Sequence, residues 1–211
     1  IQLELLNDNC EEIYNANESG NLCIKFPWPG ILRTTYNDHE RCRTNYFSLF
    51  PNKYFTGDGA LRDEEGNYRI IGRVDDVLNV SGHRIGTAEL ENAINSHPSV
   101  IESAIVSFPH PIKGEGIYAF VILSTSELEP PSLKEEIRIQ VKSKIGSFAC
   151  PDEIQIVSGL PKTRSGKIMR RILRKIAEGK VEELGDLTGL LDPNVVQIII
   201  NDKMKSTENL F

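Results

Sequence analysis

Residues 72–91 read GRVDDVLNVSGHRIGTAELE, and the pattern of the chain changes within this stretch. Before it, short apolar runs are separated by polar or Gly/Pro-containing segments, which is typical of strands and loops. After it, helical and strand periodicities alternate. We therefore predict a domain boundary here, with residues 1–73 in one domain and residues 74–211 in another.

The segment before the boundary is predicted to be β-rich. Strands are expected at residues 1–6 and 22–26. A hairpin is expected from the apolar runs at 53–56 and 68–71, because the turn residues at 63–66 end in a glycine that tolerates positive φ.

The segment after the boundary is predicted to form an α+β module in which helices flank a short central sheet. Thr87 is expected to cap a first helix, and Ser132 with Glu135 forms a capping-box pattern before a second. Strands are expected at 103–108, 117–123 and 153–157, and a basic helix is expected to start near Lys167.

Composition excludes little beyond a few classes of protein. The chain has 211 residues and a formal net charge of -6, which argues against a protein that coats nucleic acid. No apolar run approaches the roughly 20 residues that span a bilayer, and the first residues lack the pattern of a signal peptide. We expect a soluble protein of the cytoplasm, with the nucleus as the alternative compartment, and the start at Ile1 predicts a fragment.

The four cysteines do not form a recognisable site. They are widely separated, without the paired spacing of metal or redox motifs. We interpret them as ordinary thiols: Cys10, Cys23, Cys42 and Cys150.

The strongest chemical signal is PKTRSGKIMRR at residues 161–171, where a glycine-containing loop presents Lys167. Backbone donors at a helix start and a flexible ammonium group both favour an anion such as phosphate or carboxylate. On charge alone, however, a solvated basic helix is favoured, because the full spacing of a P-loop is absent.

Two further segments carry polar residues suited to a nucleotide. In YFTGDGA, residues 54–60, Asp58 lies between glycines and could accept two ribose hydroxyls, although an acidic turn residue is the commoner role. Arg73 and Arg84 present planar donors suited to phosphate, although each singly is more often part of a surface salt bridge.

Taken together, these motifs resemble the acetyl-CoA synthetase family of acyl-adenylate-forming enzymes. The resemblance rests on the run at 72–91, on PHPIKGEGIYAFV at 109–121, and on PKTRSGKIMRRILRKIA with the later LGDLTGLLDP. It implies that residues 1–73 end a large adenylating domain and that residues 74–211 form a small mobile domain. It also implies activation of acetate by ATP to acetyl-AMP, with release of pyrophosphate, and transfer of the acetyl group to coenzyme A.

The resemblance assigns roles to individual residues. Lys167 corresponds to the catalytic lysine that bridges carboxylate and α-phosphate, and a deacetylase or acetyltransferase would act on it. Asp58 corresponds to the ribose-binding aspartate, Arg73 and Arg84 to nucleotide-binding arginines, and Asp75 to the hinge between two domain poses.

The remaining implied positions concern coenzyme A and a metal. Ser81 and Gly82 correspond to the coenzyme A channel, and Lys142 to a basic position near the coenzyme's phosphates, although a surface lysine is the plainer interpretation. The implied cofactors are ATP/AMP, Mg²⁺ and coenzyme A. The positions where the family can hold magnesium are Asn95, His97 and Val100, although a histidine before proline more often has no ligand role.

Two alternatives remain open. One is a propionyl-CoA or other short-chain acyl-CoA synthetase, because the acyl pocket would lie in the missing large domain. The other is a non-catalytic module that binds RNA or an acidic partner through residues 162–180, which hold eight basic residues. If the resemblance to the acetyl-CoA synthetase family holds, the expected partners are acetate, ATP, coenzyme A and the upstream domain, with no membrane or nucleic acid. The fragment alone is then expected to be inactive.

Overall fold

The structure, a computed structural model, describes residues 1–124 and 131–208, except for the side chains at 75, 83, 84 and 205–208. The chain divides into two compact units, Ile1–Val77 and Leu78–Phe211. The boundary that we predicted from the sequence lies between residues 73 and 74. Each unit is described by itself below.

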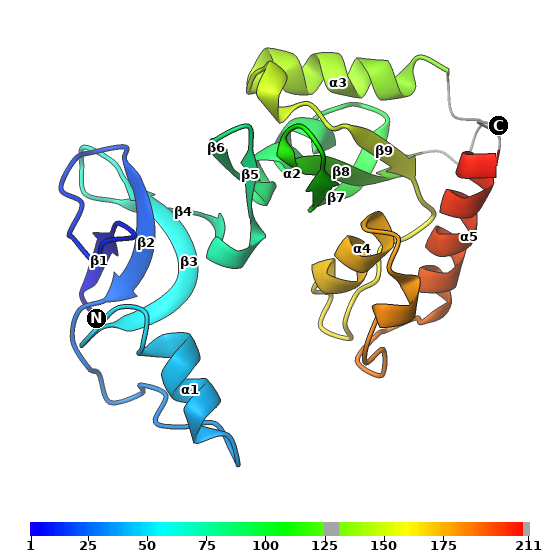
Figure 1. Cartoon of the computed structure of the whole chain (residues 1–211). Coiled ribbons are helices and arrows are strands. Elements are labelled where there is room, and N and C mark those ends of the chain that lie inside the picture. Colours follow the sequence, from blue (N-terminus) through cyan, green and yellow to red (C-terminus); the bar gives the residue numbers. More distant parts are fainter. Residues whose placement is uncertain (125–130, 209–211) are drawn as a thin grey trace. The chain divides into compact units, whose positions relative to one another are not determined.

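The first unit is an antiparallel sheet of four strands in the order β1-β2-β3-β4 (Figure 1). A helix, α1 (His39–Tyr46), lies between the second and third strands in the sequence. The predicted hairpin forms, with Arg62 opposite Tyr68 and a turn closed by a 3.1 Å hydrogen bond from the Gly66 N–H to the Asp63 carbonyl. The strands are β1 (Leu3–Leu6), β2 (Ser19–Ile24), β3 (Tyr54–Arg62) and β4 (Tyr68–Arg73).

A glycine on β3 allows an arginine of β4 to lie against the main chain. Gly57 has a φ of +79°, and a Cβ added there would lie 2.5 Å from a terminal nitrogen of Arg73. That distance is too short for any real contact, so a side chain at Gly57 and the observed position of the guanidinium exclude each other.

The second unit is built on a five-stranded sheet. Its strands run in the order β6-β5-β8-β7, and β9 pairs with β8 in parallel. Since β7 pairs with β8 along the whole strand, β5 and β9 must share the other edge of β8. The strands are β5 (Val77–Val80), β6 (His83–Gly86), β7 (Val100–His110), β8 (Gly114–Leu123) and β9 (Glu153–Ile156).

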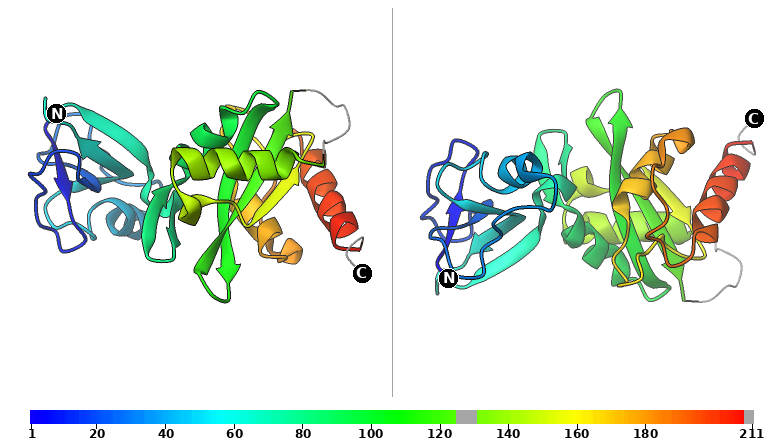
Figure 2. Two further views of the ribbon diagram at one scale, coloured as in Figure 1. Left: turned by 90° about the horizontal axis from the view of Figure 1, so that it is seen from above. Right: turned by 90° about the horizontal axis from the view of Figure 1, so that it is seen from below.

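Helices cover both faces of this sheet (Figures 1 and 2). On β7, Ile105 packs in one core with α2 and α3, whereas Ala104 and Val106 pack in a second core with α4 and α5. Alternate residues of the strand therefore serve different cores, and both faces are buried. The helices are α2 (Thr87–Asn95), α3 (Leu133–Lys144), α4 (Arg170–Ala177) and α5 (Asn194–Glu208), with 3₁₀ turns η1 (Val74–Asp76), η2 (Ser147–Ala149) and η3 (Val181–Glu183).

The predicted α+β class is confirmed, but both predicted helix caps are wrong. Thr87 is a buried first residue of α2, and the preceding Gly86 has no side chain to cap the helix. Ser132 does precede α3, yet its φ and ψ of -83° and -16° are helical and its side chain caps nothing. A capping side chain needs an extended backbone at that position to reach the free amides, so Glu135 completes no capping box.

The basic helix also begins later than expected. α4 starts at Arg170, so Lys167 lies in the preceding loop and not in the first helical turn. The loop before α4, and not the first turn of the helix, therefore presents the ammonium group of Lys167.

A buried polar connection joins the sheet to α5. The Tyr118 hydroxyl donates to Oε1 of Gln155 over 2.9 Å, and Nε2 of Gln155 donates to the Ile199 carbonyl over 2.8 Å. Burial also raises the pKa of the Tyr118 hydroxyl, so the group stays a neutral donor. Gln155 thus satisfies one group on β8 and one on α5.

We expect Gln155→Ala to destabilise the chain by about 2–4 kcal/mol, because two buried polar groups lose their partners. Urea unfolding followed by circular dichroism measures this. Gln197→Ala is the matched control, since Gln197 is exposed and its side chain donates to Asn201 on its own helix. Equal losses for both variants would contradict the role of Gln155.

We expect Gly57→Ala to cost more stability than Gly66→Ala. Both glycines have positive φ, but a Cβ at Gly66 meets open space. The free energy of unfolding of Gly66→Ala should therefore fall only by the backbone strain, about 1 kcal/mol. The excess at Gly57 measures the displacement of Arg73. Urea unfolding followed by fluorescence of Trp28, the single tryptophan, reports on this unit; equal costs would show that the guanidinium moves aside freely.

Candidate functional site

In the first unit, the structure brings together two residues that the sequence assigned to nucleotide binding. Asp58 on β3 lies directly opposite Arg73 on β4. The Arg73 guanidinium donates to the Thr56 carbonyl over 3.1 Å and lies 3.4 Å from Oδ1 of Asp58. The carboxylate side chain is 32% exposed and the guanidinium 47%, so both reach solvent at one place on the sheet.

The backbone of this site is held by a threonine. The Thr56 hydroxyl donates to the Leu22 carbonyl over 3.0 Å and accepts the Asp58 N–H over 3.1 Å. The two bonds join β3 to β2 and fix the start of the Gly-Asp-Gly segment. The carboxylate of Asp58 is thus presented from a rigid strand, because its main chain is bonded on both sides.

In the second unit, Lys167 lies on a tight loop that its neighbours hold in place. Thr163 donates its N–H to the Lys167 carbonyl over 2.9 Å, and its hydroxyl accepts the Lys167 N–H over 3.1 Å. Gly166, at a φ of +83°, closes the turn by donating to the Thr163 carbonyl. The main chain of Lys167 is fixed while its side chain is exposed.

Ion pairs anchor this loop on both sides. Before it, Nζ of Lys162 lies 2.7 Å from Oε2 of Glu102 on β7. After it, Arg170 makes two bonds of 2.7 and 2.8 Å to Glu91 on α2, both side chains being largely buried. Sequence reasoning missed both glutamates, since the paired residues lie 60 and 79 positions apart and no local pattern links them.

Other basic side chains of residues 162–180 are also occupied. Lys175 pairs with Glu183 at 2.7 Å, and Lys180 pairs with Glu178 at 2.9 Å. Arg171 donates to the main-chain carbonyls of Leu184 and Asp186. The segment is therefore not a strip of unpaired cations.

Ser81 and Gly82 form the tip of the β5–β6 hairpin. Their φ values of +50° and +84° are those of a two-residue type I′ turn. Both residues are exposed, and a Cβ at Gly82 would meet nothing. The tip is thus a bare, narrow turn to which a ligand can come close.

Lys142 lies exposed near the end of α3, in a basic corner. Burial raises the pKa of the nearby Cys150 thiol, and the charges of Lys142, Lys113 and Arg138 oppose that rise. Two of these cations, Lys142 and Arg138, lie on α3, and Lys113 comes from the turn between β7 and β8; the sequence alone indicated only Lys142.

The predicted metal residues lie together at the end of α2, but the ring of His97 is already engaged. Its Nδ1 accepts the Ser99 N–H over 3.3 Å, and its Nε2 lies 3.5 Å from Oε2 of Glu136. Asn95 and Val100 would offer only main-chain oxygens, and the Asn95 side chain already accepts from Ser103. Within residues 1–124 and 131–208, no three His, Cys, Asp or Glu side chains gather as a metal site. The ring does not fit the role of a ligand.

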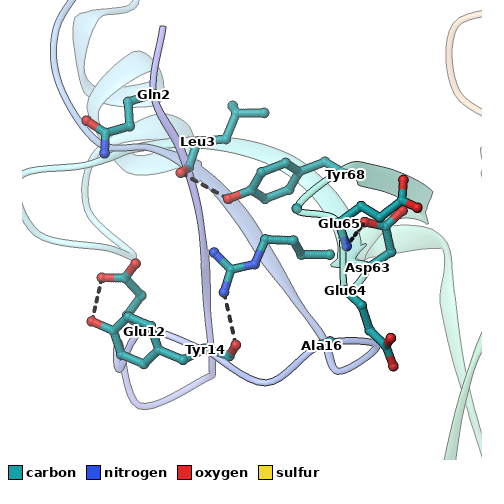
Figure 3. A pocket seen from close by; sticks show the side chains of 11 residues that line it. Gln2, Leu3, Glu12, Tyr14, Ala16, Asp63, Glu64, Glu65 and Tyr68 are labelled. Carbon is teal, nitrogen blue, oxygen red and sulfur yellow. Dashed lines mark hydrogen bonds between the residues drawn. The ribbon is translucent and has the colours of Figure 1, made fainter.

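A pocket of about 500 Å³ lies in the first unit, and no predicted site residue lines it (Figure 3). Glutamates and Asp63 line it, as does Arg62, whose guanidinium donates to the Tyr14 carbonyl over 3.0 Å. Tyr14 in turn donates to Glu12 over 2.9 Å, and Tyr68 to the Leu3 carbonyl over 3.1 Å. These contacts hold strands and loops of the unit together, so the residues that line the pocket have a structural role.

Two predicted site residues, Asp75 and Arg84, have side chains outside the described part of the structure. Their main chains lie in η1 and β6. Their predicted roles as hinge and phosphate ligand stay predictions. No helix in the described part of the chain combines the length and apolarity that a membrane crossing requires.

Comparison with known proteins identifies the relatives of this chain. Residues 89–167 match the family described as AMP-binding enzyme C-terminal domain. The acetyl-coenzyme A synthetase of Aeromonas hydrophila is 55% identical over 206 residues, which are 98% of this chain and 32% of that protein. The one from Syntrophobacter fumaroxidans is 58% identical over 88% of this chain and 28% of its own length. The chain thus spans about a third of these relatives.

Solved structures agree in fold. The acetoacetyl-CoA synthetase from Streptomyces lividans has a TM-score of 0.81 at 21% identity, over 97% of this chain and 31% of its own. An anthranilate CoA ligase, AuaEII, in complex with anthranoyl-AMP has a TM-score of 0.74 at 29% identity, over 86% of this chain and 34% of its own. By sequence and fold, this chain carries the C-terminal domain of the AMP-binding enzyme family, within a sequence similar over nearly its whole length to acetyl-coenzyme A synthetases.

Proposed function

We propose that the intact protein to which this chain belongs is an AMP-forming acetate–CoA ligase. A carboxylate oxygen of acetate attacks the α-phosphorus of ATP and pyrophosphate leaves, giving acetyl-AMP. The sulfur of coenzyme A then attacks the acetyl carbonyl carbon and AMP leaves. The observation that carries the proposal is 55% identity to an acetyl-coenzyme A synthetase over 98% of this chain.

Lys167 is the group proposed to bring the two anions of the first step together. Carboxylate and phosphate repel each other, and a cation between them offsets that repulsion. In support, no ion pair is recorded for the Lys167 ammonium among the described residues, whereas the basic residues on either side of its loop are paired. A fixed main chain with a free ammonium suits a group that must enter a site.

Asp58 and Arg73 are proposed to hold the nucleotide. Among the described residues, Oδ1 of Asp58 faces Arg73, and no partner is recorded for Oδ2. That oxygen is available to accept a hydrogen bond from a ribose hydroxyl. Arg73 adds donors for phosphate oxygens.

The second step is proposed to use other residues of the small domain. Ser81 and Gly82 would line the channel for coenzyme A, and Lys142 with its basic corner would meet the coenzyme's phosphates. Asp75 is proposed as the hinge about which the domain turns between the two steps, and Arg84 as a phosphate ligand after that turn.

Finer points of this function are also proposals. Acetate is preferred to propionate because the curated relatives reported above carry the acetyl name. Mg²⁺ would accompany ATP as its counterion, with no step assigned to His97. Acetylation of Lys167 would abolish its charge and so switch off the first step, with a deacetylase restoring it. The cytoplasm is the proposed location, with the nucleus as the alternative.

A module that binds RNA or an acidic partner is the alternative from another class. Such binding requires cations that can meet phosphates, usually with stacking aromatic side chains. Residues 162–180 contain no aromatic residue, and at least four of their eight basic side chains are in ion pairs with glutamates. This observation disfavours the alternative.

We expect Lys167→Ala in the full-length enzyme to reduce acetate-dependent ATP/pyrophosphate exchange by a hundredfold or more, on the scale of losing one preorganised group that stabilises a transition state. Formation of acetyl-CoA from supplied acetyl-AMP should remain within about threefold, since the lysine acts only in the first step.

Arg164→Ala is the matched control, because Arg164 is an exposed cation on the same loop. It should leave both half-reactions nearly unchanged. Persistence of exchange in Lys167→Ala would show that the proposed role of the lysine is wrong. Equal loss in both variants would trace the effect to the charge of the loop instead.

A further inference from the structure

The β5–β6 hairpin meets the sheet through β5, while β6 leads directly into α2 and buries Ile85 in the core shared with that helix. In the sheet order, β6 is the outer strand and β5 separates it from β8. The pairing recorded between β5 and β8 consists of Val80 opposite Gly114. A single ladder pair is a weak constraint on where a hairpin sits along its neighbour.

A glutamate supplies a second main-chain contact at this junction. Glu115 follows Gly114 on β8, and its Oε2 accepts the N–H of Asn79 over 2.7 Å. A carboxylate that accepts from an amide makes a stronger bond than a neutral acceptor does. Asn79 lies one residue before Val80, so the carboxylate extends the short ladder toward the start of β5.

The β7–β8 turn is braced where the hairpin tip meets it. Ser81 donates its N–H to the Lys113 carbonyl over 3.4 Å. The Lys113 N–H donates to Nδ1 of His110 over 3.2 Å, and the Lys113 ammonium pairs with Asp152. Asp152 also accepts the N–H of Ile117 over 2.9 Å, so the turn is fixed to the body of the sheet.

Apolar packing alone does not select this register. Leu78 and Val80 point into the core and are 1% and 0% exposed. Alternation decides which face of β5 is buried, but a slip by two residues would keep the same face inward. The polar contacts made by Asn79 and Ser81 therefore add to the packing of Leu78, Val80 and Ile85 in fixing one register.

We propose that Glu115 is a positioning residue for the thioester-forming step, holding the Ser81–Gly82 tip where coenzyme A must pass. The inference rests on the proposed function of that tip. Glu115 itself touches neither substrate nor the reacting atoms in this role; it acts through the Asn79 N–H and the register of β5.

The test uses the full-length enzyme with Glu115→Ala, Glu115→Gln and Glu182→Ala. Glu182 is an exposed glutamate of η3 in the same unit and serves as the control. Three quantities are measured: the KM for coenzyme A with supplied acetyl-AMP, acetate-dependent ATP/pyrophosphate exchange, and amide hydrogen exchange of the peptide covering residues 77–86.

For Glu115→Ala we expect a KM for coenzyme A raised about tenfold, on the scale of losing one charged hydrogen bond, and faster hydrogen exchange in the hairpin. ATP/pyrophosphate exchange should stay within twofold. Glu115→Gln keeps an acceptor oxygen and should restore most of the loss, and Glu182→Ala should behave like the unmutated enzyme.

Unchanged hydrogen exchange in Glu115→Ala overturns the inference, because the carboxylate then does not hold the hairpin. Faster hydrogen exchange with an unchanged KM for coenzyme A also overturns it, and traces the failure to the function proposed for the tip. Equal loss in both half-reactions overturns it as well, since that outcome reports a general defect in folding.

Discussion

The second unit depends on the antiparallel ladder between β7 and β8. The two strands pair from Val100 opposite Leu123 to His110 opposite Gly114, with one irregularity near the start. Their alternate side chains feed two separate cores, one with α2 and α3 and one with α4 and α5. The helices of the two cores therefore pack on opposite faces of these two strands, and β5 and β9 pair with β8.

This arrangement explains how an exposed lysine can be positioned accurately. The loop of Lys167 has no apolar side chain buried at its tip, so burial cannot fix it. Its position is set instead by polar anchors on the central elements: Glu102 on β7 and Glu91 on α2. Glu91 also accepts the N–H of Ile105 over 2.9 Å, which links the anchor directly to the ladder.

The same sheet also carries the hairpin proposed to act in the second chemical step, but the means of attachment differ. The Lys167 loop is held by ion pairs between side chains from distant parts of the sequence. The Ser81–Gly82 tip is held by main-chain N–H groups that donate to Glu115 and to the Lys113 carbonyl. Because the anchors are distinct, a substitution can alter one attachment without the other, which is what separate tuning of the two proposed half-reactions would require.

The sequence by itself determined the elements whose local pattern is strong. Leu133, Ile137 and Val141 recur every four residues, which is typical of an amphipathic helix, and all three side chains are buried in α3. The motifs that contain Lys167, Asp58 and Ser81 are also visible in the sequence, but the roles of these residues rest on the resemblance to a family and stay predictions. Sequence reasoning missed α5, whose Val and Ile residues favour strands by propensity; it is helical where Val196, Ile199 and Ile200 pack into the second core.

Only the tertiary structure decided how the ends of elements and the charges are arranged. A cap depends on backbone angles, so Ser132 and Thr87 looked like caps in the sequence and are not. Lys167 lies in a loop and not on a helix, because an antiparallel β-bridge pairs Lys162 with Ile168 and α4 begins only after it, at Arg170. The partners Glu91, Glu102 and Glu115 could not be foreseen, because an ion pair or hydrogen bond between distant residues depends on spatial proximity, which no local pattern encodes.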